Sequence, residues 1–143
     1  MDLVGLDGPG LAGFRRDNLI ATSNIPEDRI AAFALLDVSL DGALLGIVEK
    51  PDAGDVARAG HDAMISMNLW RFDSRIFDAC RDVPSSPRGE FELPSAVMLA
   101  REHGVRFSVV PSVGPVLDLS RRGDVAEVTR RLTGSAGKDL TSA

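Results

Sequence analysis

Three places in this sequence put polar side chains directly after or inside an apolar stretch, where they can take part in chemistry. Glu49 and Lys50 follow "LLGIV", Asn68 lies inside "MISMNLW", and Asp118 lies inside "VLDLS". In open α/β sheets ligands bind beyond the ends of the strands, so these positions are candidates for ligand binding. Lys50 is the most unusual of them, because the chain has only one other lysine, Lys138, among its 16 basic residues.

Each candidate also has an ordinary structural explanation. Glu49 and Lys50 are typical of a solvated strand end as well. Asn68 is equally typical of a β-bulge or of a hydrogen-bonded buried amide, and Asp118 is typical of a residue that caps a turn. Arg88, in "SSPRGEFE", is typical of a loop arginine in water. Residue type and position alone leave both interpretations open for every candidate.

The elements that must position these residues alternate between strands and helices. Apolar stretches predict strands at residues 33–38, 43–50, 64–72, 105–112 and 115–120. Asp41 and Gly42 stand between the first two stretches as a strong signal for an antiparallel hairpin. The sequence therefore predicts a mixed α/β fold with a mainly parallel sheet, one antiparallel hairpin and flanking helices.

Helical spacing predicts the elements that cover this sheet. Helices are expected at residues 53–60, 73–83, 92–104 and 124–132, with a single helical turn within 25–33. In the second of these helices Ile76, Phe77 and Cys80 share one face, the spacing of a helix packed on a sheet. Gly104 stands where a C-cap glycine is favoured.

The two ends of the chain differ in character from the part between them. Residues 1–24 are rich in Gly, Asp and Asn without a sustained period, and they predict an irregular segment. Residues 25–132 form the predicted α/β domain. Residues 133–143 are small and polar, and they predict a flexible tail.

Composition restricts the class of protein. The length of 143 residues suits one domain, and the net charge of −5 without a basic cluster argues against binding to nucleic acid or to an acidic membrane surface. The single cysteine excludes a disulfide framework. The sequence contains no apolar run long enough to cross a membrane and no secretory leader, so we expect a cytoplasmic protein.

Four motifs in order resemble the second half of the sugar-phosphate nucleotidyltransferases, which make NDP-sugars and pyrophosphate from an NTP and a sugar 1-phosphate. The motifs are "GIVEKPD", "SMNLWRFD", "RGEFELPSAV" and "VLDLSRRGDV". The resemblance extends over about residues 33–132 and lies in the succession of motifs rather than in any single one. It implies that residues 25–132 are the C-terminal part of a Rossmann-like nucleotidyltransferase domain.

The resemblance also implies a role for each candidate residue. Glu49 would accept hydrogen bonds from sugar hydroxyls, while Lys50 and Arg88 would hold the sugar phosphate as the catalytic cations of this half. Asn68 would lie near the sugar. Asp118 would help to hold Mg²⁺ against the phosphates, since hard cations take oxygen ligands.

The sequence also departs from the family. Ser120 and Arg121 stand where the family has Gly and Thr, and "ELPS" replaces E-[IL]-T-D. The glycine-rich NTP loop, G-x-G-[ST]-R, is absent from the 143 residues, although "GLDGPGLAG" is rich in glycine. We therefore expect a chain that is inactive alone and binds NTP only through a missing N-terminal half.

Two alternatives and one expected partner complete the hypothesis. A non-catalytic sugar-phosphate-binding or regulatory module would retain the same residues without the nucleotide half, and a purely structural fragment would bind no ligand. Because strands of the first half would be missing from the sheet, we also expect strand 43–49 or its neighbours to expose an edge and to support self-association.

Overall fold

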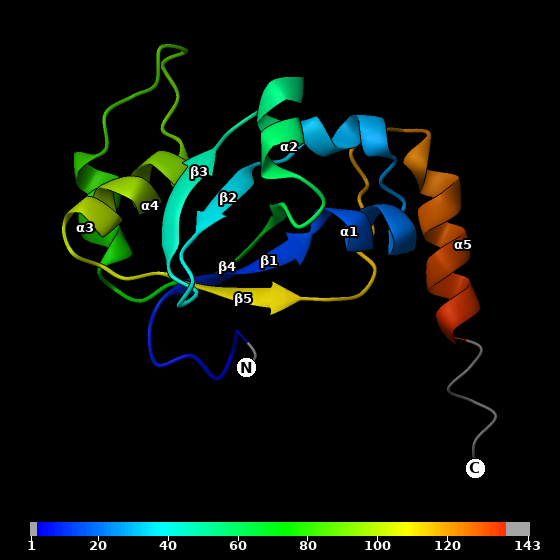
Figure 1. Ribbon diagram of the computed structural model, residues 1–143, viewed down its shortest axis with the longest axis horizontal. Helices are drawn as coiled ribbons and strands as arrows, with labels where there is room; N and C mark the ends of the chain where they lie inside the picture. The colour runs from blue at the N-terminus through cyan, green and yellow to red at the C-terminus, as the bar shows by residue number, and fades with distance from the viewer. Residues whose placement is uncertain (1–2, 137–143) are drawn as a thin grey trace.

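The computed structural model describes residues 3–136 and shows a five-stranded sheet flanked by helices (Figure 1). The strands are β1 (Gly10–Arg15), β2 (Leu35–Val38), β3 (Leu44–Val48), β4 (Met64–Arg71) and β5 (Ser108–Ser112), in the order β3-β2-β4-β1-β5. The predicted mixed α/β class and the hairpin of β2 and β3 are confirmed.

The prediction of a mainly parallel sheet is wrong, because only β1 and β5 pair in parallel. A helix between two strands normally indicates a parallel pair, and α2 (Ala53–Ala59) does connect β3 to β4. These two strands do run in the same direction. However, β2 is inserted between them and pairs antiparallel with both.

The remaining helical elements agree with the predicted positions. They are η1 (Glu27–Ala32), α3 (Ile76–Asp82), α4 (Leu93–Glu102) and α5 (Asp124–Ala136), and a further helix, α1 (Arg16–Thr22), lies in the segment predicted to be irregular. Residues 115–120 do not form the predicted strand. Residues 133–136 continue α5, contrary to the predicted tail, while 137–143 lie outside the described residues.

The prediction of an irregular segment at residues 1–24 is wrong, because β1 is an inner strand that pairs with both β4 and β5. Its two glycines suggested a loop, but close packing requires both. A Cβ on Gly10 would lie 2.4 Å from the carbonyl oxygen of Ser108. A Cβ on Gly13 would lie 2.7 Å from side-chain atoms of two neighbouring strands. Glycine here allows close approach of strands.

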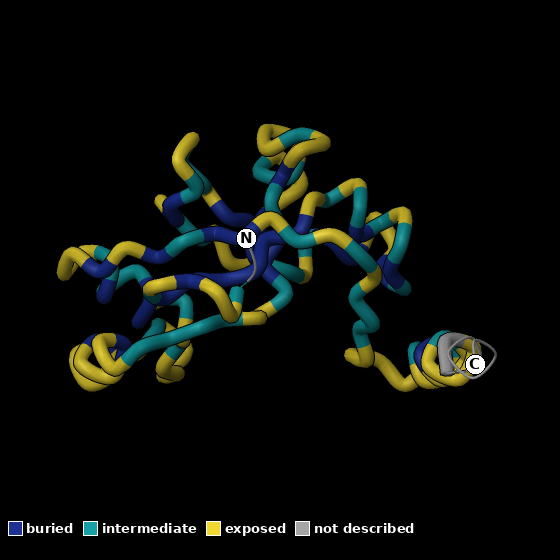
Figure 2. Tube along the Cα trace, turned by 90° about the horizontal axis from the view of Figure 1, so that it is seen from below, coloured by how far each residue is buried: buried dark blue, intermediate teal, exposed yellow. Residues whose placement is uncertain are grey.

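The helices lie on both faces of the sheet, and each face has its own apolar cluster. One cluster joins β-strand residues such as Leu11 and Leu36 to Val97 of α4 and to Phe107. The other joins Leu35 and neighbours to α1 and η1. In Figure 1, α3 and α4 lie at one end of the molecule, whereas α1, η1 and α5 lie at the other. Figure 2 shows the buried chain concentrated between them.

The predicted inner face of α3 is only partly right. Ile76 is buried, but Phe77 is 64% exposed and Cys80 is also exposed. Ala79 and Val83 are buried instead. Ile76, Ala79 and Val83 are spaced by three and four residues, as on one helical face, and all three belong to the apolar cluster on this side of the sheet.

Strand β3 is an edge strand, as expected for residues 43–49. Its first residue is covered, since the Leu44 amide donates to the Phe107 carbonyl at 2.9 Å and Arg101 Nε donates to the Leu44 carbonyl at 3.0 Å. The other residues of β3, 45–48, form the outer edge of the sheet. Within residues 3–136, no helix is long and apolar enough to cross a membrane.

Candidate functional site

Lys50 and Asn68 share a backbone conformation that side chains other than glycine rarely adopt. Among residues 3–136 they are the two non-glycine residues with positive φ, at 48° for Lys50 and 57° for Asn68. Asparagine tolerates this left-handed region, but lysine gains nothing from it locally. Such torsions persist only where surrounding structure imposes them, and they cluster at ligand sites.

A β-bulge imposes the conformation of Asn68. Leu11 of β1 pairs with Trp70, and Gly13 pairs with Ser66, so that residues 67–69 of β4 stand opposite a single residue of β1. The Asn68 amide donates to Ser66 Oγ at 3.3 Å inside this bulge. The side chain of Asn68 is exposed, which agrees with the bulge interpretation and rules out a buried amide.

The pairing of the strands places Lys50 and Asn68 beyond the same end of β2, the end at which Leu35 begins it. Val48 of β3 and Ile65 of β4 both pair with Leu35 of β2, from opposite sides. They are therefore about 10 Å apart, two strand spacings. Since β3 and β4 run in the same direction, Lys50 and Asn68 both follow this row at the same end. Lys50 follows the end of β3, whereas Asn68 lies inside β4, which continues to Arg71.

Arg88 lies in the loop between α3 and α4 and is held by glutamates. Its Nη2 donates to Glu92 Oε1 at 2.5 Å and lies 3.3 Å from Glu90 Oε2. The hydrogen bond to Glu92 and the charges of Glu90 and Glu92 raise the pKa of Arg88, and Glu49 adds to this effect. The carboxylate of Glu49 is thus close enough to act on the Arg88 guanidinium.

A groove of about 460 Å³ connects the end of β3 to the helices α3 and α4. Its lining includes Ile47, Glu49, Val83, Glu92, Pro94 and Met98. The apolar floor and the carboxylates at its rim resemble ordinary small-ligand sites, which combine apolar walls with a few polar groups. The groove places Glu49 beside Glu92, the residue that holds Arg88.

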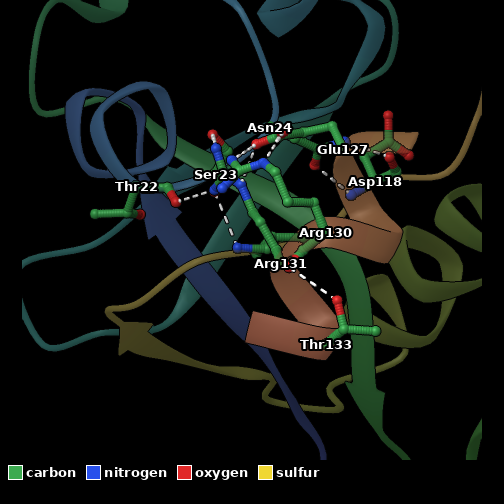
Figure 3. Close-up of polar contacts among 9 residues, drawn as sticks. Thr22, Ser23, Asn24, Asp118, Glu127, Arg130, Arg131 and Thr133 are labelled. Atoms are coloured by element: carbon green, nitrogen blue, oxygen red, sulfur yellow. Dashed lines mark hydrogen bonds and ion pairs between the residues drawn. The ribbon is translucent and has the colours of Figure 1, made fainter. Parts of the chain in front are cut away.

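Asp118 lies among residues of η1 and α1 and is not connected to this groove by any contact described for it. Its backbone is paired with the side chain of Asn24 (Figure 3). The Asp118 amide donates to Asn24 Oδ1 at 2.8 Å, and Asn24 Nδ2 donates to the Asp118 carbonyl at 2.7 Å. Its carboxylate bonds to Arg29 and to Ser120. Neither Glu49 nor Arg88 is among these partners of Asp118.

The surroundings of Asp118 do not fit a magnesium ligand. Oδ2 accepts from Arg29 Nη2 and Oδ1 accepts from Ser120 Oγ, so a cation would have to displace a guanidinium and remain near its charge. In the described part of the chain, no group of three or more His, Cys, Asp or Glu side chains is placed to hold a metal ion.

Sequence reasoning missed two residues of these sites. Glu92 stands four residues after Arg88, a spacing that could have indicated their ion pair. Arg29 gave no such signal, since its carboxylate partners lie far away in the sequence, beyond β5. Comparison with known proteins gives no matching family model and no matching curated protein.

Proposed function

We propose that this chain is the sugar-phosphate-binding half of a nucleotidyltransferase that forms an NDP-sugar and pyrophosphate from an NTP and a sugar 1-phosphate. The observation that supports it best is the left-handed backbone of Lys50, which lies with Asn68 beyond the same end of β2. Both residues are also candidates for chemistry by residue type and sequence position. The bulge of β4 accounts for the torsion of Asn68, whereas the torsion of Lys50 has no such local cause, and it is this strain at Lys50 that favours a ligand site over a solvated strand end.

In this proposal the groove holds the sugar and its edge holds the phosphate. The Glu49 carboxylate accepts hydrogen bonds from sugar hydroxyls, and Asn68 lies beyond the same end of β2. The Lys50 ammonium supplies a compact charge for the phosphate. Arg88 supplies a planar guanidinium that can bind two phosphate oxygens at once.

Arg88 must exchange partners for this role. Its guanidinium is bound to Glu92 and is 55% exposed, so a phosphate can reach it from solvent. A phosphate oxygen would compete with the Glu92 carboxylate for Nη2. Because an exposed ion pair contributes little, this exchange costs little free energy.

The full reaction also needs groups that bind the triphosphate of the NTP. The sugar phosphate oxygen attacks the α-phosphorus of the NTP and pyrophosphate leaves, a reaction promoted mainly by positioning and charge neutralisation. The glycine-rich triphosphate loop is absent from the sequence. Mg²⁺ would supply further charge neutralisation in the whole enzyme, but the surroundings of Asp118 do not fit a ligand role.

The test is isothermal titration of the chain with hexose 1-phosphates and with the corresponding free hexoses. Lys50→Ala should weaken binding of the sugar phosphate by about 1.5–3 kcal/mol, the usual contribution of a hydrogen bond to a charged group, and leave the free sugar unaffected. Glu49→Ala should weaken both. Lys138→Ala is the matched control, because it removes the chain's other lysine.

Two outcomes decide against the proposal. Failure of the parent to bind any hexose 1-phosphate contradicts it, and so does unchanged binding by Lys50→Ala. Pyrophosphate assays separate the proposal from the alternative of a regulatory module. Release of pyrophosphate when a separate nucleotide-binding half is added supports the enzyme, whereas binding without turnover under every such condition favours the module.

A further inference from the structure

Arg29 is a buried arginine that links two distant carboxylates. Its side chain is 7% exposed, and the side chains of Asp118 and Asp124 are each 14% exposed. Nη1 donates to Asp124 Oδ1 at 2.8 Å and Nη2 to Asp124 Oδ2 at 3.2 Å, a bidentate pair, while Nη2 also bonds to Asp118 Oδ2. Charge-assisted bidentate pairs of this kind are strong and fix geometry.

Other donors complete the coordination of the two carboxylates. Ser120 Oγ donates to Asp118 Oδ1, and the Arg121 amide donates to Asp124 Oδ2 at 2.8 Å. Every carboxylate oxygen of the pair therefore has a donor from the protein. Such pairing is typical of a structural hydrogen-bond network, and a metal ion on either carboxylate would have to share its oxygens with a guanidinium.

Further polar contacts join the same two parts of the chain. The Gly114 amide donates to Asn18 Oδ1 at 3.2 Å, and the Val116 amide donates to Ser23 Oγ at 2.9 Å. Arg131 donates to the carbonyl of Ser23 at 3.0 Å and also to that of Thr22, as Figure 3 shows. Residues 113–132 are thus attached to α1 and η1 at several points.

Apolar burial contributes less to this attachment. Val128 of α5 is buried, but Val125 is 50% exposed and Leu132 is 57% exposed. Polar contacts tie α5 to the rest of the molecule at both ends of the helix, through Asp124 to Arg29 and through Arg131 to Thr22 and Ser23. The position of α5 therefore depends on hydrogen bonds and ion pairs.

We propose that Asp118 is a structural residue, and that Arg29 with Asp118 and Asp124 forms a clasp that fixes residues 113–132 against α1 and η1. The guanidinium occupies the position next to Asp118 where a metal ion was expected from the sequence. Removal of one carboxylate leaves a buried cation with fewer partners, so the clasp should loosen as a unit. This inference does not depend on sugar-phosphate binding.

The test compares the parent chain with Asp118→Asn and with the control Asp78→Asn, whose aspartate is 68% exposed in a pair within α3. Hydrogen exchange should become about tenfold faster or more across 113–132 and α1 in Asp118→Asn, as expected for loss of a hydrogen bond to a charged group. Asp78→Asn should leave this region unchanged. Millimolar Mg²⁺ should not raise the melting temperature of the parent.

A measurement on the unmodified chain keeps the test valid even if Asp118→Asn does not fold. Mn²⁺ added to the isotope-labelled parent should leave the amide signals of Asn24, Asp118 and Asp124 no broader than those of exposed acidic segments elsewhere in the chain. Selective broadening at these residues overturns the proposal. Mg²⁺-dependent stabilisation that disappears in Asp118→Asn, or unchanged exchange across 113–132 in that variant, overturns it equally.

Discussion

Lys50 and Asn68 lie beyond the same end of β2, and both have a backbone in the left-handed region, with φ of 48° and 57°. Lys50 directly follows Glu49 at the end of β3, and Asn68 lies in the bulge of β4. The two positions can be tested separately, because glycine relieves the strain and a β-branched residue increases it.

Replacing Lys50 by glycine should separate stability from binding. Lys50→Gly removes the left-handed strain of a non-glycine residue and should raise the free energy of unfolding by about 1 kcal/mol. The same change removes the ammonium and should abolish the preference for sugar 1-phosphate over free sugar. Lys50→Ala should lose the preference without the gain in stability. Urea unfolding and titration calorimetry measure both effects, and a Lys50→Gly variant less stable than Lys50→Ala contradicts the strain argument.

At Asn68 the test is a substitution that increases strain, so the expected change in stability is a loss. Asn68→Val should lower the free energy of unfolding by about 1–3 kcal/mol, because a β-branched residue is poorly tolerated at positive φ. Asn68→Gly should fold with nearly the stability of the parent. Leu69→Val is the control, since Leu69 is also exposed in the bulge but is not among the residues with positive φ. Equal losses in the two valine variants would show that the bulge, and not the torsion, sets the cost.

Some parts of the fold were predictable because local signals determine them. Asp41 and Gly42 predicted the hairpin, and Gly42 has the positive φ of 76° that such a turn requires. Helix α4 followed from its periodicity, with Gly104 at φ 89° just beyond its end. Strand direction was not predictable, since the insertion of β2 between β3 and β4 depends on pairing between distant segments. The same is true of β1, whose glycines satisfy contacts with other strands.

In the candidate site, too, local signals were predictable and contacts between distant segments were not. The positions of Glu49 and Lys50 just after β3 and of Asn68 inside β4 could be predicted, because apolar strands are visible in the sequence. Asp118 could not be assigned, because its surroundings depend on Arg29 from a distant turn. A carboxylate looks the same in sequence whether its partner is a metal ion or a guanidinium. Only the three-dimensional contacts distinguish the two.

The glycines of β1 give a prediction about packing. Gly10→Ala should destabilise the protein by about 1–3 kcal/mol, the usual cost of overpacking, because its Cβ would lie 2.4 Å from a backbone oxygen of Ser108. Gly13→Ala should cost less, since its 2.7 Å contacts are with the side-chain ends of Met64 and Val109, which can move. Thermal unfolding of the two variants checks the order. The reverse order would mean that β1 and β5 separate more easily than side chains rearrange.

The edge of β3 predicts association between chains. Edge strands with unpaired backbone groups and apolar side chains tend to pair with other strands, and Leu45 on β3 is 40% exposed. The apparent mass in sedimentation should therefore rise with concentration, and Leu45→Lys should suppress the rise. Leu40→Lys, at a fully exposed position of the hairpin turn, is the matched control. A parent that stays monomeric at every concentration contradicts this expectation.

Helix α5 predicts a loss of stability in acid. Hydrogen bonds from Arg130, and then from Arg131, lower the pKa of Glu127 from 4.5 to about 2. Since the folded state favours the ionised carboxylate, its contribution is complete above about pH 4.5 and is lost as the pH falls towards about 2. The contribution is small, because the Glu127 side chain is 36% exposed and solvent screens the pair.

Two measurements check this expectation. Carboxyl NMR titration should show the pKa of Glu127 rising in Arg130→Gln, because the largest cause of the shift is removed. Protection of the α5 amides against hydrogen exchange, relative to their intrinsic rate at each pH, should fall below about pH 4.5 in the parent and should respond less to acid in Glu127→Gln, which carries no titrating group at this position. Arg131 also holds the carbonyls of Thr22 and Ser23, so protonation of Glu127 should loosen the attachment of α5 to α1. An acid response of α5 that is identical in the parent and in Glu127→Gln would assign it to the clasp carboxylates instead.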